Sequence, residues 1–177
     1  LFLWDGYVEV GIDHFAKPGD GMAKALKAGA LRRNFQGYTD DTAPALIGIG
    51  ASSISRFPQG FAQNASATAA HTKAIRAGRF SVHKGHRFAG EDLLRARIIE
   101  ALMCDFFVSR AELLRDFDVT AGHVEVLFQR AAGEFGEMVK VSDEGFLIPD
   151  RARPLTRMIA RAFDAYDSTK AKHSSAI

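Results

Sequence analysis

The sequence predicts an α/β segment followed by a mostly helical domain. In residues 7–12 and 47–55, apolar side chains alternate with small or polar ones, which is the period-two pattern of a strand. From Glu91 onward, apolar residues instead recur three and four positions apart, which is the helical period. We therefore expect one domain over residues 1–80 and a helical one over 81–177.

The first domain is expected to begin with the strand at 7–12, which runs into Asp13 and His14. Polar groups that follow a strand in this way face the active site of a β/α barrel, so Asp13 and His14 are placed for chemistry, or His14 is simply oriented by a neighbour. Asp20 is suited to cap a helix over 21–28, and Gly29 to end it. The remaining segments are a helix over 66–77 and a loop or short strand over 80–90.

The strand-like stretch at 47–55 is built largely of glycine and serine around Ile47, Ile49 and Ile54. Such residues weaken an ordinary strand, so their presence indicates either the close approach of a ligand or backbone, or packing against a helix that needs room. We also expect exposed apolar surface around these isoleucines.

The second domain is expected to hold a buried helix from Glu91 to Phe106, followed by two helices capped by Ser109 and Thr120. A β-hairpin within 138–149 and a terminal helix over 155–166 follow, and the tail from Lys170 is expected to be disordered. Three helices and a hairpin follow the order of a winged helix. A stand-alone interaction or DNA-binding module is therefore one alternative function.

The overall composition of the 177 residues excludes few classes of protein. The net charge of +2 gives no argument for a nucleic-acid or membrane partner. The single cysteine, Cys104, rules out an internal disulfide and favours a cytoplasmic location. We expect it to be a buried apolar residue, and we expect no metal at His83 and His86 because these two histidines lack further ligands.

Four sequence blocks resemble the oxygen-independent coproporphyrinogen III oxidases, a radical S-adenosylmethionine family. In chain order they are Gly11-Ile12-Asp13-His14-Phe15-Ala16-Lys17-Pro18, Arg33-Asn34-Phe35-Gln36-Gly37-Tyr38-Thr39, Gly48-Ile49-Gly50-Ala51-Ser52-Ser53-Ile54-Ser55 and Ala62-Gln63-Asn64. The residues from Asp92 to Phe106 are also similar to that family's C-terminal region. Since the chain begins at Leu1 and not at methionine, we expect a C-terminal fragment.

The resemblance implies a closing β/α segment of a partial TIM-like barrel, with S-adenosylmethionine and a [4Fe-4S] cluster as cofactors. It implies that Gln36 and Ile54, with Phe35 beside them, bind S-adenosylmethionine. Arg32, Arg33 and His14 are candidates for binding the substrate, coproporphyrinogen III, whose propionates match a guanidinium.

In the family, a radical derived from S-adenosylmethionine takes hydrogen from two propionates, which become the vinyl groups of protoporphyrinogen IX. The cluster ligands would lie in a missing N-terminal barrel portion, because the chain lacks a cysteine triplet. We therefore expect no catalytic residues and no metal ligands here, and an inactive fragment. A radical S-adenosylmethionine haem chaperone is the second alternative function.

Overall fold

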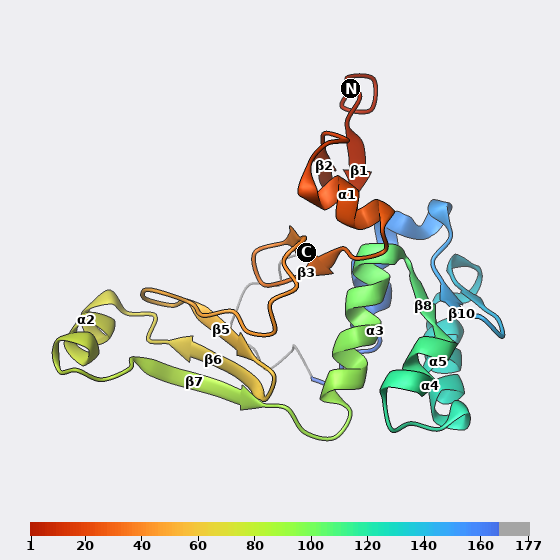
Figure 1. Ribbon diagram of the computed structural model, residues 1–177. Coiled ribbons are helices and arrows are strands. Elements are labelled where there is room, and N and C mark those ends of the chain that lie inside the picture. Colours follow the sequence, from red (N-terminus) through yellow and green to blue (C-terminus); the bar gives the residue numbers. More distant parts are fainter. Residues whose placement is uncertain (167–177) are drawn as a thin grey trace. The chain divides into compact units, whose positions relative to one another are not determined.

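The computed structural model describes residues 1–166, which form two compact units. Residues 1–40 and 91–166 make the split unit, and residues 41–90 make the inserted unit. Both contain helices and strands (Figure 1), in keeping with the mixed fold class expected from the sequence. The tail from Lys170, expected to be disordered, lies outside the described residues.

The first 40 residues hold two small antiparallel pairs of strands. β1 (Val8–Val10) pairs with β2 (His14–Ala16), and β3 (Arg32–Arg33) pairs with β4 (Tyr38–Thr39). The strand expected over 7–12 therefore ends at Val10, because Gly11 turns the backbone at φ 61°. His14 consequently lies in a hairpin strand and not just beyond the end of a longer one.

Between these pairs lies α1 (Gly21–Lys27), where the sequence predicts a helix. The Asp20 carboxylate accepts a hydrogen bond from the Met22 N–H at 2.9 Å, as expected of an N-cap. Gly29 follows the helix at φ 63°, a conformation that favours glycine. Val10, Ala16, Ala23 and Leu31 form a small core that is completed by Cys104.

The rest of the split unit is built around α3 (Asp92–Asp105). In chain order after it come β8 (Phe107–Ser109), α4 (Arg110–Asp116), α5 (Ala121–Phe135), the 3₁₀ helix η1 (Gly136–Met138), β9 (Lys140–Val141), β10 (Gly145–Leu147), the 3₁₀ helix η2 (Asp150–Leu155) and α6 (Thr156–Arg161). β10 is the middle strand of an antiparallel sheet with β8 and β9.

The predicted caps of this region are confirmed. Ser109 accepts a hydrogen bond from the Glu112 N–H, and Thr120 accepts one from the His123 N–H. The Glu112 side chain does not complete a capping box with Ser109, because its carboxylate binds Arg97 at 2.5 Å. The core beneath these helices includes three fully buried rings in mutual contact, those of Phe128, Phe146 and Phe163.

The terminal helix is shorter than expected. Residues 150–155 are 3₁₀ helix, α6 ends at Arg161, and the Asp164 carboxylate accepts a hydrogen bond from the Tyr166 N–H in a turn. Along the described residues, no helix combines the length and apolar character needed to span a bilayer.

The inserted unit is a three-stranded antiparallel sheet with one helix. β5 (Ile54–Phe57), β6 (Gly60–Asn64) and β7 (Val82–Arg87) lie in that order in the sheet, and α2 (Thr68–Arg76) joins β6 to β7. The domain boundary expected at 80/81 falls inside this unit, because β7 pairs with β6 along most of its length.

The strand expected over 47–55 is wrong for residues 47–53, which form a loop. Side chains bind the loop's backbone at Gly48 and Gly50, whereas the backbone of Ser52 and Ser53 bonds to that of Ala65 and Asn64. Ser55 Oγ accepts from the Gly48 N–H at 3.0 Å, and Ser53 Oγ donates to the Gly50 carbonyl at 2.7 Å. Ile47 and Ile49 are exposed at 72% and 93%, which confirms the expected apolar surface for these two.

Candidate functional site

Tyr38 links the turn after β1 to the end of α3. Its hydroxyl donates to the Met103 carbonyl at 2.8 Å and accepts from the Ile12 N–H at 3.1 Å. Burial away from water is the main cause that raises the pKa of Tyr38, so the phenol stays protonated at neutral pH. The phenol is thus a fixed support around which neighbouring polar groups gather.

His14 lies against this support, with its ring edge-on to Tyr38 at 5.0 Å between centroids. Its Nδ1 lies 2.8 Å from one oxygen of Asp13, and the other oxygen of Asp13 binds Arg157 at 2.5 Å. Because a carboxylate only accepts, Nδ1 carries the hydrogen, which leaves Nε2 directed to the side of Gly37. Asp13 and Arg157 therefore fix which nitrogen of His14 a ligand would meet.

The segment between β3 and β4 is a tight turn beside His14. Asn34 Oδ1 accepts from the Gln36 N–H at 2.8 Å, and the Asn34 N–H donates to the Gly37 carbonyl at 2.9 Å. These two bonds hold the turn, while the side chains of Phe35, 49% exposed, and Gln36 lie at the surface. Two of the three predicted cofactor-binding residues thus sit on an ordered turn with accessible side chains.

Arg32 and Arg33 enter this turn and differ in how they are held. Arg32 pairs with Glu100 of α3 at 3.6 Å, whereas the Arg33 guanidinium lies 5.8 Å from the centre of the Tyr38 ring. The Arg33 Nε is buried and has no hydrogen-bond partner among the described residues. A buried N–H without an acceptor is what a ligand carboxylate would satisfy, so Arg33 is the stronger anion-binding candidate of the two.

Ile54 belongs to the inserted unit, at the first position of β5. The backbone just before it is held by Asn64, whose amide donates to the Gly50 carbonyl at 2.9 Å and to Ser53 Oγ at 3.1 Å. A Cβ at Gly48 would lie 2.7 Å from the Ile54 carbonyl oxygen, so a close approach of backbone requires that glycine. Of the predicted site residues, His14, Arg32, Arg33, Phe35 and Gln36 share the split unit, and Ile54 does not.

Comparisons with known proteins agree on one family of enzymes. An oxygen-independent coproporphyrinogen III oxidase of Paracoccus denitrificans is 59% identical over 177 residues, which is 100% of this chain. One from Cereibacter sphaeroides is 53% identical over 169 residues, or 96% of the chain. The chain is homologous to part of these oxidases. No protein-family model matches it.

A solved structure gives the same result for the fold. The coproporphyrinogen III oxidase of Escherichia coli, described as a radical SAM enzyme, matches 94% of the chain with a TM-score of 0.86 and 28% identity. The chain spans 39% of the length of that structure, 39% of the Paracoccus oxidase and 38% of the Cereibacter oxidase. Most of each oxidase therefore has no counterpart in this chain.

The side chains described here do not fit an iron–sulfur cluster. Within residues 1–166, no group of three or more His, Cys, Asp or Glu side chains is arranged to hold a metal ion. Cys104 is fully buried, and the pKa of its thiol is raised to about 12, chiefly by burial. A thiolate ligand or nucleophile at this position is therefore disfavoured.

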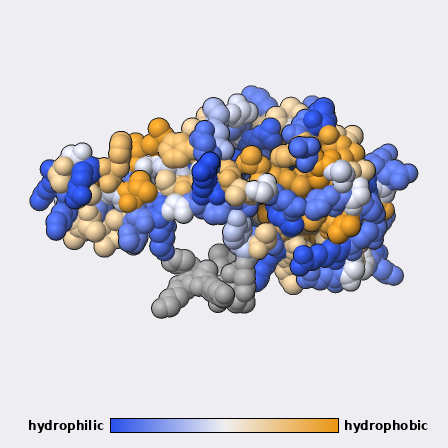
Figure 2. All heavy atoms as spheres, turned by 90° about the horizontal axis from the view of Figure 1, so that it is seen from below, coloured by the Kyte–Doolittle hydropathy of each residue, from blue (hydrophilic) through white to orange (hydrophobic). Residues whose placement is uncertain are grey.

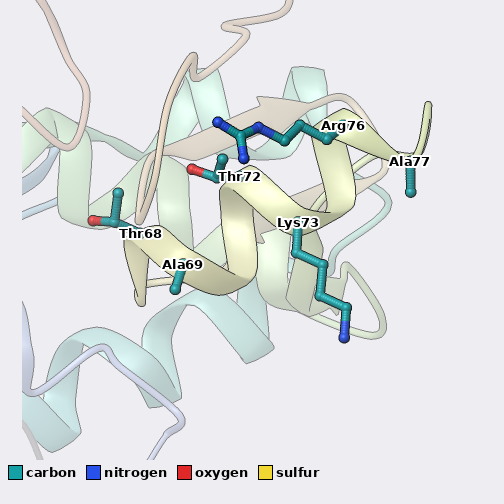
Figure 3. A pocket seen from close by; sticks show the side chains of 6 residues that line it. All are labelled: Thr68, Ala69, Thr72, Lys73, Arg76 and Ala77. Atoms are coloured by element: carbon teal, nitrogen blue, oxygen red, sulfur yellow. The ribbon is translucent and has the colours of Figure 1, made fainter.

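Two of the hollows elsewhere on the surface lie one in each unit. One, of about 760 Å³, is lined by residues of α2 and its end. In Figure 3, Arg76 extends beside Thr72, while Lys73 points to the other side of the helix. The other, of about 280 Å³, is lined by Glu9, Gly11, Leu26, Cys104, Asp105, Phe106 and Arg153. Neither is lined by any of the predicted site residues, which are His14, Arg32, Arg33, Phe35, Gln36 and Ile54.

Three residues important to this geometry were missed from the sequence: Tyr38, Asn64 and Arg157. The first two lie in blocks that resemble the oxidases, so their position in those blocks was the available signal. Arg157 lies on α6, where the arginines of a terminal helix would be expected to face solvent. It is instead paired with Asp13, 144 positions earlier in the chain, and no local pattern reveals such a pair.

Proposed function

We propose that this chain is part of an oxygen-independent coproporphyrinogen III oxidase, which converts two propionates of coproporphyrinogen III to the vinyl groups of protoporphyrinogen IX. The observation that supports this most is the 59% identity along the whole chain to an oxidase of that name. S-adenosylmethionine, when bound, would supply the radical that takes a hydrogen atom from each propionate, which then loses carbon dioxide and one electron to give the vinyl group. The cluster ligands would come from the part of the protein outside this chain.

The turn at 34–37 would form part of the S-adenosylmethionine site. Gln36 offers an amide that both donates and accepts, and Phe35 offers an exposed ring for apolar contact. In the inserted unit, the resemblance gives Ile54 a role in binding S-adenosylmethionine, and Asn64 and the neighbouring serine bonds hold its backbone. The ordered hydrogen bonds of both segments support a preorganised site.

Substrate propionates would be bound beside this turn. Arg33 has an unsatisfied buried N–H, and His14 presents Nε2 on the Gly37 side of the same turn. Arg32 would play a smaller part, because Glu100 already neutralises its charge. Binding by Arg33 and His14 together would position a propionate next to the cofactor without any proton transfer by this chain.

The proposed architecture is a closing segment of a partial TIM-like barrel together with a winged-helix-like domain. The chain order of α3, β8, α4, α5, β9 and β10 supports the second part of this proposal. We do not extend it to DNA binding. The face of α5 that would meet DNA carries Glu125 and Glu134, and Glu125 already binds Arg110 at 2.7 Å. The cytoplasmic location expected from the sequence remains a prediction.

The full-length protein that contains this chain provides the test. We would purify it without oxygen, reconstitute its cluster, and follow coproporphyrinogen III by mass in the presence of S-adenosylmethionine and a reductant. The wild type should lose two carboxyl groups in steps, and Gln36→Ala should slow both steps. Gln59→Ala, an exposed glutamine in the turn between β5 and β6, is the matched control and should leave the rate unchanged.

Each outcome separates one alternative. A fully loaded cluster with no decarboxylation, combined with stable haem binding, would identify a haem chaperone. Equal rates for Gln36→Ala and Gln59→Ala would remove the turn at 34–37 from the cofactor site while leaving the oxidase activity established.

A further inference from the structure

The two units carry opposite charges, which the near-zero total conceals. Residues 41–90 contain six lysine and arginine residues and one aspartate, a net charge of +5. The described residues of the split unit contain 15 lysine and arginine residues against 19 aspartate and glutamate residues, a net charge of −4. The basic residues of the inserted unit are therefore concentrated and are not part of an evenly mixed surface.

Among the described residues, these six cations also lack ion pairs. Eight arginines of the split unit pair with carboxylates. None of the six cations of the inserted unit pairs with a carboxylate of residues 1–166. They are Arg56, Lys73, Arg76, Arg79, Lys84 and Arg87, and all six side chains are exposed. Their positive field is consequently not neutralised locally.

Large apolar side chains are exposed among four of these cations. Between Lys73 and Lys84, Phe80 is 95% exposed, Ile75 is 52% exposed and Val82 is 54% exposed. We call residues 73–84 the basic–apolar segment. Figure 2 shows hydrophilic and hydrophobic atoms next to each other over the part of the molecule that holds α2 and β7.

Phe80 is held in this exposed position by ordered backbone on both sides. The Arg79 N–H donates to the Ala74 carbonyl at 3.0 Å, at the end of α2. On the other side Ser81 is buried, its hydroxyl lies 2.6 Å from His71 Nδ1, and its carbonyl accepts from the Ala65 N–H. The ring is thus presented to solvent by a fixed scaffold, at a cost in exposed apolar area that a binding partner would remove.

We propose that the basic–apolar segment is a peripheral docking surface for an anionic lipid bilayer. A unit of 50 residues that holds six cations and one aspartate fits a partner that is extended and uniformly negative. Exposed aromatic and aliphatic side chains among lysines and arginines are the pattern of interfacial membrane binding. Protection of the β7 edge by charge would explain Lys84 but not Phe80 or the cations of α2.

The proposed function gives a reason for a lipid partner, and this one step of the argument rests on that function. Loss of two carboxyl groups makes the product more apolar than the substrate, so release at a bilayer would keep it out of water. The charge and exposure of the segment are independent of that reaction.

The test is sedimentation of the full-length protein with vesicles of phosphatidylglycerol and phosphatidylcholine at low ionic strength. Each cation near an anionic surface contributes about fivefold to binding. The triple variant Lys73→Gln, Arg76→Gln, Arg79→Gln should therefore bind about 100-fold more weakly. Lys17→Gln, Lys24→Gln, Lys27→Gln removes the same charge from exposed lysines of the split unit and should bind within about twofold of wild type.

A second variant tests the apolar part. Phe80→Ala should weaken binding about tenfold while leaving the circular dichroism and unfolding midpoint unchanged, because the ring is already exposed. Pure phosphatidylcholine vesicles and added salt should both abolish binding. These measurements need neither a cluster nor turnover, so a failure of the oxidase assay would leave their outcome intact.

Three results would overturn the proposal. The first is a wild-type protein that does not sediment with the anionic vesicles. The second is an equal loss of binding in the two triple variants. The third is binding of a short duplex DNA more tightly than the vesicles, since that would assign the segment to nucleic acid. A normal decarboxylation rate in every variant would be consistent with a docking surface separate from the reaction.

Discussion

Replacing Gly11 by alanine tests the support on which the candidate site rests. A Cβ at this position would lie 2.1 Å from Cζ of Tyr38, and the backbone φ is 61°. The left-handed conformation costs alanine about 1 to 2 kcal/mol. The Tyr38 ring must also move, which sacrifices its hydrogen bonds to Ile12 and Met103 at about 1 kcal/mol each. We expect Gly11→Ala to destabilise the split unit by about 3 to 4 kcal/mol.

Gly29→Ala is a matched control, because Gly29 has nearly the same φ, 63°, and no atom within 4 Å of its added Cβ. Gly29→Ala should lower the free energy of unfolding only by the cost of the left-handed conformation, about 1 to 2 kcal/mol. Urea unfolding followed by circular dichroism gives both values, and hydrogen exchange of α3 and of the β1–β2 hairpin assigns the loss to the split unit.

The decisive comparison is a double-mutant cycle with Tyr38→Leu. In the Tyr38→Leu background, Gly11→Ala should lower the free energy of unfolding only as much as Gly29→Ala does. The coupling free energy between Gly11 and Tyr38 would then be about 2 kcal/mol. Equal costs for Gly11→Ala and Gly29→Ala in the wild-type background would refute the reasoning, because the Tyr38 contact would then contribute nothing.

Three further predictions concern other contacts. Arg157→Gln should lower the free energy of unfolding in urea by less than about 1 kcal/mol, because Arg157 and Asp13 are each nearly half exposed. It should nevertheless slow decarboxylation several-fold, because Asp13 would no longer hold His14 in place. Arg130→Gln is the control and should change neither value. Asn64→Asp should speed hydrogen exchange of residues 48–53 and lower the free energy of unfolding by about 2 kcal/mol, because a carboxylate cannot donate to the loop carbonyls. The control Gln59→Glu should change neither value. Because burial raises the pKa of Cys104 to about 12, the folded protein binds its proton more tightly than the unfolded chain does. Stability should therefore fall from about pH 8.5 towards 12. Cys104→Ala should flatten this dependence in urea titrations, and unchanged curves would contradict it.

The sequence identified elements whose ends are determined by local chemistry. Asp20, Ser109 and Thr120 each bind an N–H two or three residues later, so a helix start could be predicted from a short window. The strand expected at 47–53 was wrong for the opposite reason. A strand needs a partner, and at Gly48 and Gly50 the side chains of Ser53, Ser55 and Asn64 bind the backbone groups that a partner strand would bind.

The candidate site was partly predictable for a similar reason. Phe35 and Gln36 were found because the resemblance lies in consecutive residues, whereas the pairing of Arg157 with Asp13 joins positions far apart in the chain. The charge separation was present in the sequence but required the unit boundaries at 40/41 and 90/91, which only the structure supplied.

The split unit has a consequence for how the chain acquires its structure during synthesis. Its N-terminal core is closed by Cys104, which the ribosome adds long after Leu31 and only when the whole inserted unit has been synthesised. At about 5 to 20 residues per second, this interval lasts several seconds. Throughout it, residues 1–40 remain without their last packing partner, so this part of the split unit becomes stable only after the inserted unit that follows it has been made.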